Sequence, residues 1–94
     1  MESFARYREA GVNMSLGTDT NPQSVIEAMR WATVLSKTME RNTEATTAAH
    51  VFDAATLGGA RAVGRDDLGR IAPGAKADLV LWKAGSWRMT PLRD

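Results

Sequence analysis

The chain has 94 residues, enough for one small domain or for part of a larger one. Acidic and basic side chains nearly balance, leaving a formal net charge of +1. Charge therefore gives no support for a nucleic-acid or anionic-membrane partner, because phosphate binding requires clustered cations. The absence of cysteine excludes disulfides and thiolate metal sites, and it suits a reducing cytoplasm. No apolar run approaches the roughly 20 residues of a membrane span, so we expect a cytoplasmic protein.

The first twenty residues predict a helix, a strand and a loop. Phe4 and Tyr7 share one helical face, and Gly11 is a natural stop because glycine accepts the left-handed conformation. Residues 12–16 then alternate apolar and polar side chains, which is the period of a strand. A loop follows, in which Asn21 is expected to cap the next helix and Pro22 to take its first position.

A long amphipathic helix is predicted over residues 22–41. Its wet side carries charged residues at helical spacing, and its apolar side comprises Val25, Ala28, Met29, Ala32, Leu35 and Met39. Trp31 lies at the margin of that side, so a buried structural role is expected for it. The apolar face is too wide for a lone surface helix and requires a packing partner.

Two short helices should follow, the first capped by Thr47 and the second by Thr56 and ended by Gly64. The two glycines at residues 58–59 weaken the second helix locally, and close backbone packing would explain their presence.

The last part of the chain predicts a turn and a buried strand. Residues 72–75 place proline and glycine where a type II turn favours them. Residues 77–82, with the sequence ADLVLW, are typical of a buried strand. A strand needs a neighbour, and the strand at residues 12–16 has only helices beside it in sequence. We therefore expect its pairing partners to be missing or supplied by another chain, and both ends of the sequence to be truncated.

Three segments together carry a resemblance to a known family. Residues 12–20, VNMSLGTDT, look like the last barrel strand of the amidohydrolase superfamily, with its Gly-Thr-Asp ending. Residues 54–64, AATLGGARAVG, resemble the family's "A-T-x-x-G-A-R-A-L-G" segment. Residues 68–81, LGRIAPGAKADLVL, are similar to its "G-x-I-x-x-G-x-x-A-D-L-V" segment. Their order and spacing match the family over nearly the whole chain, and its chlorohydrolase and amino-heterocycle deaminase branch is the most similar.

The resemblance implies an α/β fold, namely the C-terminal portion of a (β/α)8 TIM barrel leading into part of a small β-sandwich. Residues 1–64 would be the last β/α unit and closing helices of the barrel. Residues 65–94 would re-enter the sandwich. In such barrels the active site lies at the C-terminal ends of the strands.

The resemblance also implies a role for Asp19, which follows the last strand. In the family this acid binds or faces a divalent metal and accepts a proton from the attacking water. A capping role, or a hydrogen bond to a loop amide, is the alternative for an aspartate at such a turn. Thr20 and Asn21 lie beside Asp19 and are candidate substrate contacts, although capping or loop hydrogen bonding is the more common role of such residues.

The other metal ligands of the superfamily are histidines, and here the sequence departs from the pattern. The single histidine, His50, lies near a helix start and matches no family ligand. A metal site normally needs three or four protein ligands. We therefore expect a zinc or iron ion in the complete parent enzyme, no tightly bound metal in this chain, and no activity from the chain alone.

The sequence thus predicts a C-terminal fragment of a metal-dependent hydrolase that acts on C–N or similar bonds, not peptide bonds, of a small cyclic or amide substrate. Two alternatives remain open: a non-catalytic helical interaction module, and a subunit of a split enzyme completed by a partner chain. Exposed apolar surface, with self-association or a partner that supplies the missing barrel strands, is expected.

Overall fold

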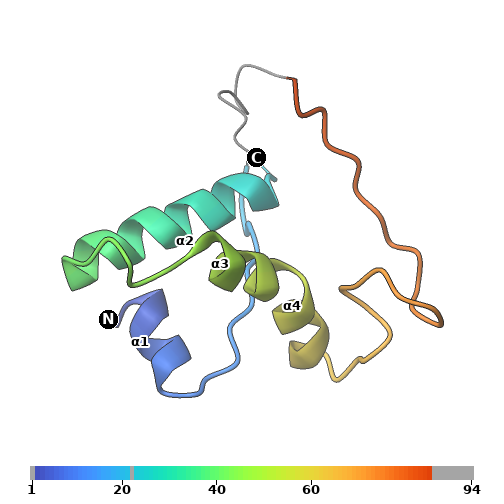
Figure 1. The fold of residues 1–94 in the computed structure, drawn as a ribbon, viewed down its shortest axis with the longest axis horizontal. Coiled ribbons are helices and arrows are strands. Elements are labelled where there is room, and N and C mark those ends of the chain that lie inside the picture. The colour runs from blue at the N-terminus through green and yellow to red at the C-terminus, as the bar shows by residue number, and fades with distance from the viewer. Residues whose placement is uncertain (1, 22, 86–94) are drawn as a thin grey trace.

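The structure is a computed structural model that describes residues 2–21 and 23–85, and it contains four helices (Figure 1). These are α1 (Phe4–Glu9), α2 (Val25–Glu40), α3 (Ala48–Ala55) and α4 (Leu57–Ala62). α2 runs along one side and contacts both α1 and α3, while α3 also contacts α4. From residue 63 to residue 85 the chain follows an irregular path without a helix (Figure 1).

Serine residues cap the N-terminal ends of α1 and α2. Ser3 accepts a hydrogen bond from the Arg6 backbone N–H at 3.2 Å, and Gly11 follows α1 with a φ of +82°, as predicted. α2 begins later than predicted, because the Ser24 hydroxyl accepts from the Glu27 N–H at 3.3 Å and so caps the helix. The prediction that Asn21 caps this helix is therefore wrong, and the position predicted for residue 22 lies outside the described residues.

The sequence correctly predicts two short helices and a turn after α2. Thr47 caps α3, and its backbone N–H donates to Nδ1 of His50 at 3.2 Å in a capping box. Thr56 precedes α4, but its hydroxyl donates to the carbonyl oxygen of Phe52 at 2.7 Å instead of capping. The turn at residues 72–75 has the predicted form, with Ala75 N–H donating to the Ala72 carbonyl at 3.1 Å and Gly74 at a φ of +84°.

Neither predicted strand is formed in the part of the chain that the structure describes. Residues 12–16 and residues 77–82 have no strand assignment there. The physical reason is that a strand is stabilised by hydrogen bonds to a neighbouring strand, and these two segments do not pair with each other. The described region is therefore helical, and a β-sandwich does not form within it; the boundary between residues 64 and 65 stays a prediction.

The core is small and partly polar. Its buried apolar side chains are Ala5, Ala45, Val51, Ala54 and Ala60. Ser36, which is 1% exposed, joins the elements around it. Its hydroxyl oxygen lies 2.7 Å from the Thr46 hydroxyl oxygen and accepts from the Ala5 N–H at 3.2 Å. Hydrogen bonds thus link α1, α2 and the loop before α3 where few large apolar side chains are buried.

Much of the apolar surface is left uncovered, as the sequence predicts. Leu35 is 53% exposed and Met39 is 49% exposed, although both belong to the predicted apolar side of α2. Trp31 is 60% exposed, so the expectation of a buried role is wrong within this chain. None of the helices in the described residues is long and apolar enough to cross a membrane.

Candidate functional site

Asp19 lies in a tight turn of the loop between residue 16 and α2. Its φ is +58°, a left-handed conformation that aspartate adopts more readily than most residues. Across it, the Thr20 N–H donates to the Thr18 carbonyl at 2.6 Å. The carboxylate is exposed and makes no hydrogen bond or ion pair within residues 2–21 and 23–85. Because Ser24 caps α2, Asp19 does not have the capping role that was its structural alternative.

The segment that leads to Asp19 is attached to α3 and α4. The Leu16 N–H donates to the Ala54 carbonyl at 3.2 Å, and Nδ2 of Asn13 donates to the Gly58 carbonyl at 3.0 Å. Gly58 also meets the carbonyl oxygen of Met14 so closely that a Cβ there would overlap it. The predicted close packing is thus confirmed at Gly58. Gly59 has nothing within 4 Å of the corresponding position.

Arg61 completes this attachment with two charge-assisted contacts. Its Nε donates to Oδ1 of Asn13 at 2.9 Å, and its Nη2 donates to Oδ2 of Asp53 at 2.6 Å. The guanidinium therefore connects α4 to α3 and to residues 12–16. Sequence reasoning missed this role. The available signal was Arg61 itself, the one charged residue inside the segment at residues 54–64.

The other predicted site residues gain few contacts. Thr20 and Asn21 are exposed beside Asp19, so the structure keeps the three together but does not assign a substrate to them. His50 lies near the start of α3, as predicted, and its side chain takes part in the capping box of that helix.

A divalent metal does not fit the residues described here. No group of three or more histidine, cysteine, aspartate or glutamate side chains that could hold a metal occurs among them. Asp19 by itself supplies one carboxylate, whereas a protein site normally needs three or four ligands.

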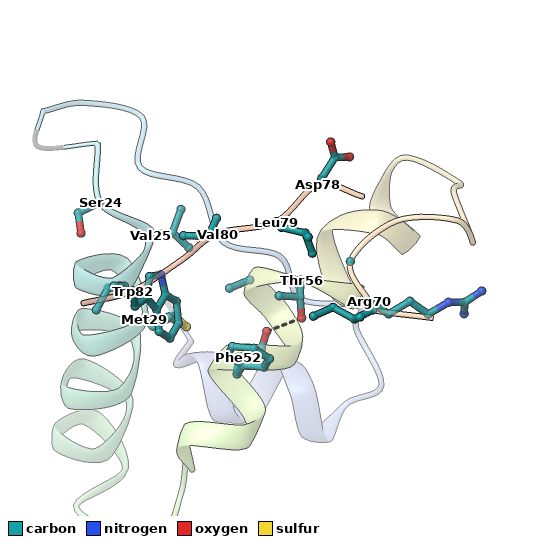
Figure 2. Close-up of a pocket in the computed structure, with 14 residues that line it drawn as sticks. Ser24, Val25, Met29, Phe52, Thr56, Arg70, Asp78, Leu79, Val80 and Trp82 are labelled. Atoms are coloured by element: carbon teal, nitrogen blue, oxygen red, sulfur yellow. Dashed lines mark hydrogen bonds between the residues drawn. The ribbon is translucent and has the colours of Figure 1, made fainter. Parts of the chain in front are cut away.

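A separate apolar groove of about 680 Å³ lies between α2, α3 and the irregular segment after α4 (Figure 2). Val25, Met29 and Phe52 form one side of it, and Leu79 and Val80 form the other. Asp19, Thr20 and Asn21 do not line the groove. One wall of the groove thus belongs to residues 77–82, the segment that the sequence predicts to be a strand.

The charged pairs that perturb pKa values lie away from Asp19. Hydrogen bonds from Ser3 and Arg6 lower the pKa of Glu40, and this carboxylate thereby connects α1 to the end of α2. The hydrogen bonds from Arg65 likewise lower the pKa of Asp67, with both contacts at 2.7 Å. These pairs are structural and take no part in the candidate site.

Comparison with known proteins gives a consistent family. The model of the amidohydrolase family matches residues 1–93. The chain is 42% identical to a 5'-deoxyadenosine deaminase of Methanothermobacter thermautotrophicus over 94 residues, which cover 96% of the chain and 22% of that protein. It is 48% identical to an imidazolonepropionase of Anaeromyxobacter sp. over 81 residues, covering 86% of the chain and 18% of the relative. A 5-methylthioadenosine/S-adenosylhomocysteine deaminase of Desulforudis audaxviator is 35% identical over 94 residues, covering 95% and 22%.

The chain belongs to the amidohydrolase family, a family of hydrolases that generally use a divalent metal. It spans about a fifth of the length of these curated relatives, at 22% of the deaminases and 18% of the imidazolonepropionase. No solved structure gives a significant match to it.

Proposed function

We propose that this chain is the C-terminal part of a metal-dependent amidohydrolase, in which Asp19 is a catalytic carboxylate and one ligand of a zinc or iron site. The other ligands would come from outside the chain, in the same polypeptide or in a partner. Alone, the chain would bind no metal tightly and would have no activity.

One observation carries the proposal: the Asp19 carboxylate is exposed and has no partner among the described residues, although its backbone is held at a φ of +58°. A left-handed aspartate has an energetic cost that persists where the surroundings fix it, and such residues concentrate at functional sites. An acid that served only the loop would be expected to accept a hydrogen bond from a nearby N–H.

The names of the relatives support nitrogen heterocycles as the class of substrate. Two are deaminases of adenine nucleosides, and the third is named for imidazolonepropionate. We propose that the complete enzyme hydrolyses a C–N bond of a small nitrogen heterocycle, with deamination as the first reaction to test. The substrate of a chlorohydrolase has no corresponding support among these three names.

In this reaction the task of Asp19 is proton transfer. Its carboxylate would accept a proton from the attacking water and pass it to the departing nitrogen. A carboxylate placed within hydrogen-bond reach of that water contributes about 10² to 10⁴-fold to such a step. Thr20 and Asn21, exposed next to it, would contact the substrate.

A subunit of a split enzyme is the second candidate. The observation that favours it is the uncovered apolar surface of α2, where Trp31 and Leu35 are 60% and 53% exposed. A partner chain that supplies barrel strands would cover such a surface. The non-catalytic interaction module predicts instead a discrete species on which Asp19 has no chemical role.

The test is a hybrid enzyme in which residues 1–94 replace the matching segment of the Methanothermobacter deaminase, with ammonia release from 5'-deoxyadenosine as the readout. The proposal predicts an active, metal-containing hybrid, and Asp19→Asn should lower kcat at least about a hundredfold. Asp66→Asn, which changes an exposed acid in another loop, is the matched control. An Asp19→Asn hybrid that retains full activity contradicts the proposal.

The isolated chain gives a second test, in which metal content and mass are measured on the same sizing-column peak. Little metal, on a self-associated species, agrees with the proposal. Near-stoichiometric zinc or iron on a discrete species would show that the chain completes its own site, and the claim of inactivity would be wrong.

A further inference from the structure

Residues 12–16 are tied to the helices at both ends. At one end Asn13 bonds to Gly58 and Arg61, and at the other the Leu16 N–H donates to the Ala54 carbonyl at 3.2 Å. Asp19 follows Leu16 by three residues. The orientation in which the loop leaves the helices is therefore set by these contacts.

The contacts form one continuous chain of hydrogen bonds. Asp53 accepts from Arg61, Arg61 donates to Asn13, and Asn13 donates to the Gly58 carbonyl, at 2.6, 2.9 and 3.0 Å. The Asn13 amide uses its oxygen toward the cation and its nitrogen toward the carbonyl, so a flipped amide would lose both bonds. Arg61 can bridge the two acceptors because its donors form a rigid planar fork.

Arg61 is poorly placed to stabilise the fold itself. Its side chain is 52% exposed and that of Asp53 is 46% exposed, and exposed ion pairs contribute little to folding stability. Its contact with Asn13 joins residues 48 positions apart in sequence. The consequence of this contact is thus mainly geometric: it fixes where residues 12–16 lie on α3 and α4.

Geometry of this kind matters for a catalytic carboxylate. A displacement of about 1 Å that arises far from the reacting atoms can cost on the order of a hundredfold in rate. The turn at Asp19 is held by the bond between Thr20 and Thr18, which fixes its local shape but not its place on the protein. That place depends on the attachment upstream.

We propose that Arg61 is a positioning residue, which holds residues 12–16 against α3 and α4 through Asn13 and Asp53 and thereby places the carboxylate of Asp19. The catalytic half of this inference rests on the proposed function of Asp19. The structural half does not, and the experiment separates them.

The structural half is tested on the 94-residue chain by amide hydrogen exchange and by the amide NMR signals of residues 16–20. Arg61→Met should lower the protection of the Leu16 amide at least about fivefold and shift the signals of Asp19 and Thr20, because charge-assisted bonds are lost. Protection in the middle of α2 should stay unchanged. Arg30→Met, at an exposed cation of α2 with no ion pair among the described residues, is the matched control. Unchanged Leu16 protection and unchanged Asp19 signals in Arg61→Met would overturn the proposal.

The catalytic half is tested in the hybrid enzyme. Arg61→Met should reduce kcat about tenfold or more with little change in KM and in melting temperature, since it misplaces a reacting group without removing it. Arg61→Lys, which keeps the charge but not the fork, should retain more activity than Arg61→Met. If Arg61→Met lowers the melting temperature markedly together with kcat, the role of Arg61 is structural and the positioning role is wrong.

The two proposals fail in different ways. If Asp19→Asn leaves the hybrid fully active, the proposed function of Asp19 is wrong, whatever Arg61 does to Leu16. If Asp19→Asn inactivates the hybrid and Arg61→Met leaves kcat unchanged, Asp19 is catalytic and the positioning role of Arg61 is wrong.

Discussion

Gly58 and Met14 are in backbone contact: the carbonyl oxygen of Met14 lies where a side chain on Gly58 would begin. This contact joins α4 to residues 12–16, which lead to Asp19. It explains why a helix of six residues, Leu57–Ala62, tolerates glycine at this position. Glycine weakens the helix but allows the approach.

The two glycines of α4 should therefore respond in opposite ways to alanine. Gly58→Ala should destabilise the chain by about 1–3 kcal/mol, because the added methyl group overlaps backbone that must move. Gly59→Ala should stabilise it by about 0.5–1 kcal/mol, because nothing lies within 4 Å of the new Cβ and alanine favours the helix. Urea unfolding of both variants measures the difference, and equal effects would contradict the close contact.

Ser36→Ala should be costly for so small a change. It leaves the buried Thr46 hydroxyl and the Ala5 N–H without their partner, at a cost of about 1–3 kcal/mol in the free energy of unfolding. The control is Thr38→Ala, where the hydroxyl is exposed and bonds only to the Val34 carbonyl on its own helix. Thermal unfolding measures both variants. If Ser36→Ala loses no more stability than Thr38→Ala, the polar core contributes little.

The link between α1 and α2 should weaken in acid. Hydrogen bonds from Ser3 and then from Arg6 lower the pKa of Glu40 in the folded chain below its ordinary value of 4.5. A lowered pKa in the folded state favours folding when the group is ionised. The stabilisation is therefore fully present above pH 4.5 and is lost as the pH falls through the lowered value. The free energy of unfolding, measured from neutral pH into acid, should show this loss of stability. In the Glu40→Gln variant the dependence of stability on pH should be smaller.

The backbone at Asp19 predicts a difference between two substitutions. Asp19→Gly removes the energetic cost of the left-handed conformation, whereas Asp19→Val places a β-branched side chain in that conformation. The valine variant should be less stable than the glycine variant by about 1–2 kcal/mol. Equal stabilities in urea would show that the loop rearranges without cost.

Self-association should depend on the uncovered face of α2. Trp31→Gln and Leu35→Gln remove apolar side chains that are 60% and 53% exposed, so they should lower the average mass in sedimentation with little change in stability. Phe52→Gln, at 51% exposure on α3, tests whether the groove takes part. A mass that none of the three changes would contradict association through these surfaces.

Local patterns determined much of this molecule. The glycine at residue 11, the threonine cap at residue 47 and the proline–glycine turn at residues 72–75 all act within a few residues of themselves, and their predictions are confirmed. The three family segments likewise identified the amidohydrolase family, because they are read directly from residue order. The start of α2 was missed because Asn21 and Ser24 are both good caps, and only the backbone geometry decides between them.

Contacts between distant residues were decided by the tertiary structure alone. The bond between Arg61 and Asn13 spans 48 residues, and no periodicity in the sequence encodes it. The two predicted strands alternate or run apolar as strands do, yet a strand is defined by the neighbour with which it exchanges hydrogen bonds. Within the described residues that neighbour is absent, and for the same reason Trp31 remains exposed. The sequence thus determined the helices, the turn and the family, while long-range contact determined which segments the helices hold and which faces stay uncovered.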